Sequence, residues 1–166
     1  MEAETMKKSL LLAAVLTFCT ATCFATIPTS ELAIGGIVPG NSPSYVQSVF
    51  GAPTKYKYGT DYYGRTVERE IFFTYGKSFK IRFYDDFAIS IVSKANNGLS
   101  TPSGIHVGSS VTEVKRTFGT PDKLPPYLRN KKDILRYIDE PYSRELLLKI
   151  KNGKVIEMTL SPAEAY

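Results

Sequence analysis

Apolar residues follow two different spacings along the chain, and the same order of spacings occurs twice. In residues 110–118, Val111, Val114 and Phe118 fall on one face of a helix, and residues 42–50 show a similar pattern. After each stretch, apolar and polar residues alternate, which is typical of strands with one buried face. The pattern therefore predicts two short helices, each followed by several strands.

Both predicted helices have recognisable start and stop signals. Ser110 precedes Glu113 by three residues, as in a capping box, and Ser42 precedes Pro43, which suits the first helical position. A glycine and then a proline follow each helix and predict its end. We therefore expect one helix after Ser42 and another after Ser110.

Three strands are predicted after each helix, with turn residues between them. They cover residues 70–75, 78–84 and 87–93 in the first half, and 134–138, 145–151 and 154–160 in the second. Asn152 and Gly153 are typical of a type I′ hairpin, because both central residues of that turn have positive φ. The strands are therefore expected to be antiparallel.

The helical segments are related in sequence. Residues 36–55 align without a gap with residues 104–123, and nine of their twenty positions are identical. We predict a duplicated module, an α+β fold of two tandem helix-plus-three-stranded-antiparallel-meander repeats with the helices on one face of the sheet. The first α+β repeat would cover residues 26–98 and the second residues 99–166. We expect one continuous sheet, with two separate lobes as the alternative.

The N-terminus has the features of a signal peptide. Lys7 and Lys8 precede an apolar run over residues 10–18 and a small-residue zone that ends at Ala25. The run is too short to predict a transmembrane span. We expect residues 1–25 to be removed, with translation starting at Met1 or at Met6.

Both cysteines lie in the predicted signal peptide. Without Cys19 and Cys23, the mature chain would form no disulfide. Acylation of Cys23 would instead retain the protein as a lipoprotein, but the residues before it are atypical of a lipidation site. We favour a free protein that is secreted or periplasmic in a bacterial cell envelope.

Composition and charge narrow the classes of function. The sequence is 43% hydrophobic and 22% charged, as in an ordinary globular protein, and its net charge of +5 favours acidic partners. It contains no RNA-binding or zinc-finger motif, so nucleic acid is not an expected partner. It also shows no catalytic triad, metal-ligand spacing or phosphate-binding loop, and its single histidine, His106, has no evident partner. We expect neither enzymatic activity nor a cofactor or metal.

Candidate binding residues come from two places. Residues 55–66 are predicted to form a loop that carries four tyrosines, and one face of the predicted sheet is basic and aromatic. Tyrosine is enriched in binding hot spots, although tyrosines in a hairpin also cover sheet edges, and both interpretations stay open. The predicted protein-binding residues are Tyr56, Tyr58, Tyr62, Tyr63, Phe72, Lys80, Arg82, Tyr84, Lys149 and Lys151.

A short capped helix that ends in V-x-x-x-F-G-x-P, followed by a three-stranded meander, resembles the BamE-like (SmpA/OmlA) envelope lipoproteins. Two such units in tandem resemble the secreted β-lactamase inhibitory proteins. The matching residues are Gly40, Ser42, Val46, Phe50, Gly51 and Pro53, and Gly108, Ser110, Glu113, Val114, Phe118, Gly119 and Pro121. The resemblance implies helices on one side of an antiparallel sheet and a protein-binding surface on the other.

Together, these observations predict a secreted or periplasmic protein-binding module without enzymatic activity. It would recognise an acidic protein through its open sheet face and tyrosine-rich loop, with an inhibitor as one form of this function. The alternative is a BamE-like accessory of cell-envelope assembly that contacts the membrane surface and is lipid-anchored through Cys23.

Overall fold

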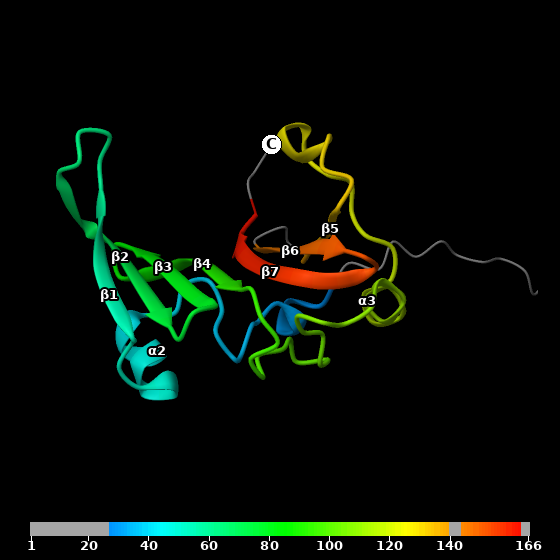
Figure 1. Cartoon of the computed structure of the whole chain (residues 1–166), viewed down its shortest axis with the longest axis horizontal. Helices are drawn as coiled ribbons and strands as arrows, with labels where there is room; N and C mark the ends of the chain where they lie inside the picture. The colour runs from blue at the N-terminus through cyan, green and yellow to red at the C-terminus, as the bar shows by residue number, and fades with distance from the viewer. Residues whose placement is uncertain (1–26, 140–143, 164–166) are drawn as a thin grey trace, which may run out of the picture.

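The computed structural model describes residues 27–139 and 144–163, in which one antiparallel sheet joins both halves of the chain. Seven strands lie in the order β1-β2-β3-β4-β7-β6-β5 (Figure 1). Their bounds are β1 (Lys55–Thr60), β2 (Thr66–Tyr75), β3 (Phe79–Tyr84), β4 (Phe87–Ser93), β5 (Ile134–Ile138), β6 (Arg144–Lys151) and β7 (Lys154–Pro162). The expected single sheet is confirmed.

The two halves of the sheet meet where β4 pairs with β7. The pairs at this junction are Ile91 with Leu160, Val92 with Thr159, and Ser93 with Met158. Ile91, Leu160 and Met158 are fully buried, so the junction is part of the core. The last strand of the first half, β4, is therefore joined edge to edge with the last strand of the second half, β7.

The two α-helices begin and end where the sequence predicts. The hydroxyl of Ser42 accepts a hydrogen bond from the backbone N–H of Tyr45 at the start of α2 (Pro43–Phe50). The hydroxyl of Ser110 accepts one from the N–H of Glu113 at the start of α3 (Val111–Phe118). Glycines with positive φ end both helices. Two 3-10 turns, η1 (Thr29–Glu31) and η2 (Pro126–Leu128), complete the helical elements of the described residues.

The predicted fold class is wrong. The described chain is mostly β, with seven strands and two α-helices of eight residues, and is not a pair of helix-plus-three-strand repeats. The difference lies in residues 55–60, which we predicted to be loop and which form β1. Gly59 led us to predict a loop, because glycine weakens a strand pattern. In the structure Gly59 lies at a register shift between β1 and β2, where a Cβ atom would lie 2.8 Å from the Cβ of Glu70, so the strand requires a glycine there.

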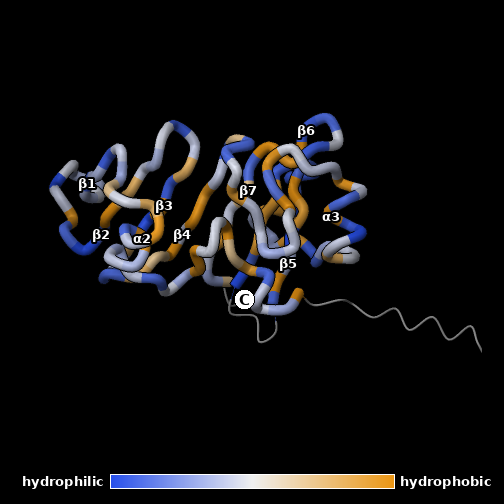
Figure 2. Tube along the Cα trace, turned by 90° about the horizontal axis from the view of Figure 1, so that it is seen from below, coloured by the Kyte–Doolittle hydropathy of each residue, from blue (hydrophilic) through white to orange (hydrophobic). Residues whose placement is uncertain are grey.

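The core lies on one face of the sheet, under α2, α3 and residues 27–37. Figure 1 shows both α-helices on the same side of the strands, and Figure 2, which looks from that side, shows hydrophobic stretches in the strands and hydrophilic ones at hairpin turns. Val46 of α2 and Val114 of α3 are buried in this core. Leu32 and Ile34 of the N-terminal segment are buried in it as well. Burial of this apolar surface is the main force that holds the sheet to its helices.

The opposite face of the sheet has projecting elements at both ends. The β1–β2 hairpin rises from one end, and residues 120–133 rise from the other (Figure 1). Within the described residues, no helix has the length and hydropathy of a transmembrane segment. The predicted signal peptide, residues 1–25 with Cys19 and Cys23, lies outside the described residues.

Candidate protein-binding surface

The strand register places one row of side chains across all seven strands, on the face away from the helices. The row consists of Lys55, Thr74, Lys80, Val92, Thr159, Leu147 and Arg136. Directly paired residues point to the same face, and Lys80 lies between the buried Phe79 and Ile81. We call this side the open face. At the usual strand spacing the row is about 29 Å long.

A basic hollow occupies the β1 end of the open face. Its volume is about 1010 Å³, and its lining includes four lysines. We name it the lysine hollow and define it by Lys55, Lys57, Lys77 and Lys80. None of the four forms an ion pair with an acidic side chain in residues 27–139 or 144–163, and all four are exposed. The hollow therefore carries positive charge without a described counter-ion.

One aromatic ring beside the lysine hollow, that of Phe72, is contacted by two cations. The ring of Phe72 has the Lys57 ammonium 5.0 Å from its centre and the Arg82 guanidinium 6.0 Å away. Arg82 also pairs with Glu70, which is on the neighbouring strand. The ion pair with Glu70 uses the charge of Arg82 within the protein, so the lysines, which have no carboxylate partner among the described residues, are better placed than Arg82 to meet an external anion.

A second aromatic site at the end of β3 is similarly arranged. The Arg69 guanidinium lies 5.2 Å from the centre of the Tyr84 ring and makes two hydrogen bonds to the carboxylate of Asp85. The hydrogen bonds from Arg69 lower the pKa of Asp85, and the same pairing raises the pKa of Arg69. Tyr84 therefore presents a ring already fixed by the protein, which reduces the entropy cost of a contact.

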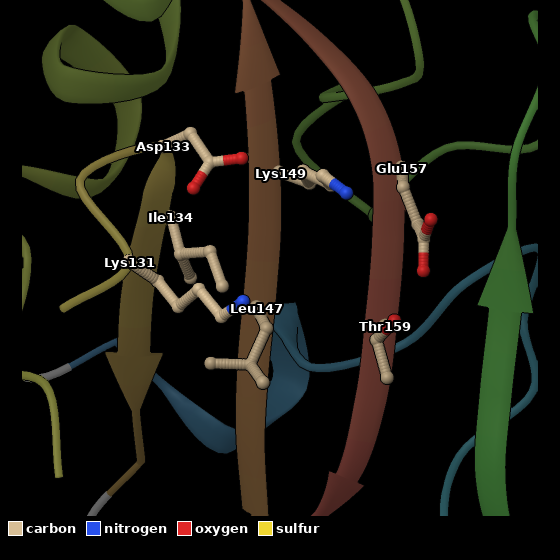
Figure 3. A pocket seen from close by; sticks show the side chains of 7 residues that line it. All are labelled: Lys131, Asp133, Ile134, Leu147, Lys149, Glu157 and Thr159. Carbon is tan, nitrogen blue, oxygen red and sulfur yellow. The ribbon is translucent and has the colours of Figure 1, made fainter. Parts of the chain in front are cut away.

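A smaller pocket lies at the other end of the open face (Figure 3). It has a volume of about 270 Å³ and is lined by Lys131, Asp133, Ile134, Leu147, Lys149, Glu157 and Thr159. Ile134 and Leu147 supply apolar surface between charged groups of both signs. Glu157 already pairs with Lys94 at 3.2 Å. The pocket has the size and lining to hold a single side chain that has an apolar body and a polar tip.

The tip of the β1–β2 hairpin forms the first wall of the open face. Tyr62 and Tyr63 are 96% and 79% exposed, and their rings contact edge to face with centres 5.4 Å apart. Asp61 orders the turn, since its carboxylate accepts hydrogen bonds from the backbone N–H groups of Tyr63 and Arg65 and from the Arg65 side chain. The hydrogen bond from the Arg65 backbone is the main cause that lowers the pKa of Asp61.

Residues 120–133 form the second wall, and a buried ion pair holds them in place. Arg136 is 7% exposed and Glu145 3%, and the Arg136 Nε lies 2.8 Å from the Glu145 Oε2. The same guanidinium donates to the Lys123 carbonyl at 3.2 Å, while the Asp122 carboxylate accepts from the Ile138 N–H at 2.8 Å. The wall is therefore fixed to the sheet by charge-assisted hydrogen bonds.

The structure divides the predicted binding residues into several groups. Phe72, Lys80, Arg82 and Tyr84 lie together on the open face, and Lys149 lies at the smaller pocket. Lys151 lies opposite Lys154 at the β6–β7 turn. The four residues on the open face share it with Lys55 and Lys57, which we did not predict. The alternation of lysine and tyrosine from residue 55 to 58 would have indicated both, had that segment been assigned as a strand.

The four tyrosines do not form one cluster. Tyr56 pairs with the buried Phe73, and their ring centres are 5.5 Å apart, so it lies on the helix side of the sheet. Tyr58 pairs with Ile71 on the same side, and its side-chain hydrogen bond raises the pKa of Tyr56 to about 12. Both rings remain nearly half exposed at the sheet edge. Only Tyr62 and Tyr63 belong to the hairpin tip.

Other polar groups have local structural partners. The ring of His106 contacts the Gly104 carbonyl at 2.9 Å and the Ser109 hydroxyl at 3.2 Å, within a tight turn. In the part of the chain that the structure describes, no three His, Cys, Asp or Glu side chains are arranged to hold a metal ion.

Comparison with known proteins finds similarity of fold alone. No family model matches the sequence, and no curated protein matches it. An extracellular protein containing a SCP domain from Bacillus anthracis superposes on 74% of this chain and 43% of its own, with 7% identity and a TM-score of 0.55. A cysteine-rich secretory protein from Staphylococcus aureus superposes on 82% of this chain and 48% of its own, with 10% identity and a TM-score of 0.58. The chain thus spans less than half of each.

The predicted resemblance to BamE-like lipoproteins and β-lactamase inhibitory proteins is therefore wrong, since the two structures of similar fold described above are an extracellular protein containing a SCP domain and a cysteine-rich secretory protein. The V-x-x-x-F-G-x-P motif misled us because it encodes a local event. Phe118 packs into the core, and Gly119 ends α3 with a φ of 78°. A buried aromatic residue followed by a helix-ending glycine suits many short helices that pack on a sheet, so the motif does not identify a family. Nothing in the described residues favours the envelope-assembly alternative.

Proposed function

We propose that this chain is an exported binding module without enzymatic activity, which recognises a protein partner through its open face. The observation that carries the proposal is the row of side chains that the strand pairing places across seven strands. The β1–β2 hairpin and residues 120–133 rise at its two ends (Figure 1). Export is supported by the signal-peptide pattern of residues 1–25 and by the extracellular and secretory descriptions of the structures with a similar fold.

The dimensions of the open face suit a protein partner. Its row is about 29 Å long, and strands of six residues are about 20 Å long, which gives about 600 Å² before the walls are added. A standard protein–protein interface covers about 800 Å² on each side. A face with two walls therefore matches a folded partner better than a small ligand.

The chemistry of the face also fits protein recognition. Phe72, Tyr84, Tyr62 and Tyr63 offer aromatic surface, and several arginines nearby are oriented by carboxylates. Aromatic residues and arginine are enriched in binding hot spots. The named side chains are held by one another and do not converge on one point, so we assign binding and no reaction to them.

Capture of a partner by the mature chain, residues 26–166, tests the proposal. The immobilised protein is exposed to culture medium and envelope extract of the native organism, beside a Tyr62→Ala/Tyr63→Ala variant and a Tyr45→Ala control on α2. We expect the hairpin variant to weaken binding at least about tenfold, because exposed aromatic anchors dominate such interfaces. The control should bind normally, and melting temperatures should agree.

If the Tyr62→Ala/Tyr63→Ala variant and the Tyr45→Ala control capture the same protein equally well, the hairpin tip is not part of the interface. Substitution of Phe72 and Tyr84 by alanine then tests the floor of the open face. Undiminished binding by that variant as well would refute recognition through this face.

A further inference from the structure

The four lysines of the lysine hollow are gathered around one site. Arg65, Arg69, Arg82, Arg136 and Lys94 each pair with a carboxylate, whereas the lysines of the hollow have no such partner among the described residues. Lys149, Lys151 and Lys154 of β6 and β7 also have no ion pair among the described residues, but they do not line this hollow. Gathering like charges around one hollow is unfavourable in the free protein. An anion placed there would relieve this repulsion and gain charge-assisted hydrogen bonds.

The hollow lies beside a free sheet edge. β1 pairs with β2 on one side and with no described strand on the other, so alternate backbone N–H and C=O groups face outward along it. The two faces of β1 differ in chemistry, with Lys55 and Lys57 on the open face and Tyr56 and Tyr58 on the helix side. An added strand would meet lysines on one side and tyrosine rings on the other.

We propose that an acidic, extended segment of the protein partner binds to β1 as an additional strand and places its carboxylates in the lysine hollow. The inference rests on the proposed function and names the chemistry of its ligand. The segment alternates acidic residues, which meet Lys55 and Lys57, with β-branched or aromatic residues, which cover Tyr56 and Tyr58. The added strand would cover the exposed parts of these two tyrosine rings, which are 47% and 46% exposed.

Lysines on an edge strand also have a simpler role, which is to prevent two copies of a protein from pairing through their edges. The two roles give opposite results when the lysines are neutralised. If the lysines only prevent edge-to-edge pairing, the neutralised variant self-associates. If they bind a ligand, the variant stays monomeric and binds the peptide more weakly.

Calorimetric titration of the purified mature chain with a synthetic ten-residue peptide of alternating glutamate and threonine tests the proposal. We expect the Lys55→Gln/Lys57→Gln variant to bind it about tenfold more weakly, since it loses two ion pairs. The Lys115→Gln/Arg116→Gln variant changes the net charge equally on exposed residues of α3 and should bind within about twofold of the parent. Added salt should weaken the parent complex.

Three further probes separate strand addition from general attraction of anions. We expect no binding of the same peptide carrying N-methyl groups on alternate residues, and weak binding of a peptide with five glutamates followed by five threonines. Inorganic polyphosphate should bind less well than the alternating peptide. The proposal is overturned if the peptide does not bind, if N-methylation has no effect, or if the lysine variant only self-associates.

The captured protein partner then separates this inference from the proposed function. If the Lys55→Gln/Lys57→Gln variant retains the partner while Tyr62→Ala/Tyr63→Ala loses it, strand addition is wrong and protein recognition by the open face stands. If both variants lose the partner, the two proposals are supported together.

Discussion

The buried pair of Arg136 and Glu145 offers a sharp test of how the second wall of the open face is held. Glu145→Gln keeps the size of the side chain and removes its charge. Arg136 would then remain buried, with hydrogen bonds to the Lys123 carbonyl and a neutral amide but no counter-ion among the described residues. The perturbation therefore isolates the cost of an uncompensated buried charge from that of a cavity.

The expected magnitude follows from the burial of both groups. With Arg136 7% exposed and Glu145 3%, little water can replace the lost carboxylate, and breaking such a pair costs about 3–5 kcal/mol. For a chain of this size the melting temperature should fall by about 10–20 °C. The Arg136→Met/Glu145→Leu double variant removes both charges and should recover most of this loss, because the pair also carries a large desolvation cost.

Urea unfolding followed by circular dichroism measures these free energies, with Glu157→Ala as control. Glu157 pairs with Lys94 at 3.2 Å in a more exposed position, so its loss should cost less than about 1 kcal/mol. A Glu145→Gln cost as small as the control's would show that water reaches Arg136. A double variant as unstable as the single one would show that packing, and not charge, holds residues 120–133.

Three other predictions concern single elements. Gly59→Val should destabilise the protein by about 1–3 kcal/mol in urea, because its Cβ would meet the Glu70 Cβ at 2.8 Å, and Glu70→Gly should relieve part of that cost. The pKa of Asp61 is lowered in the folded protein, so its contribution is complete above the ordinary value of 3.8 and is lost as the pH falls through the folded pKa. Protection of the hairpin-tip amides, measured as the exchange rate relative to that of an unstructured peptide at the same pH, should then fall below that pH, and Asp61→Asn should remove this pH-dependent change in protection. Ser110→Ala should cost about 1 kcal/mol through loss of the cap of α3, and Ser110→Thr should cost less.

Each of these has an outcome that contradicts it. Gly59→Val with unchanged stability would mean that the register shift adapts without strain. Protection of the tip amides that stays constant from pH 6 to pH 2, after correction for the intrinsic exchange rate, would show that the Asp61 carboxylate does not order the turn. An unaffected Ser110→Ala variant would show that the sheet, and not the cap, determines where α3 begins.

The elements that the sequence predicted well depend on near neighbours. Ser42 and Ser110 cap their helices through N–H groups three residues away, and Asn152 adopts the positive φ that its turn requires. β3 alternates strictly between buried and exposed positions, as its sequence predicts. These features need only the chain's own local geometry, which the order of residues contains.

β1 shows where local reasoning failed. Gly59 and the tyrosines gave residues 55–66 the composition of a loop, and the strand exists because β2 supplies its hydrogen bonds and because Phe73 packs on Tyr56. Strand propensity depends strongly on what lies opposite. Once β1 is a strand, its lysines and tyrosines separate to opposite faces, and the single tyrosine cluster that we predicted no longer exists.

The sequence by itself determined the capped helices, most strands and the apolar face of β3, since each of these depends on residues a few positions apart. Only the tertiary structure decided that β4 pairs with β7, that Lys55 and Arg136 end one row, and that residues 120–133 cover the far end of the open face. Such contacts join residues far apart in the chain. The free energy of forming them depends on which apolar surfaces are still exposed after the other elements have packed.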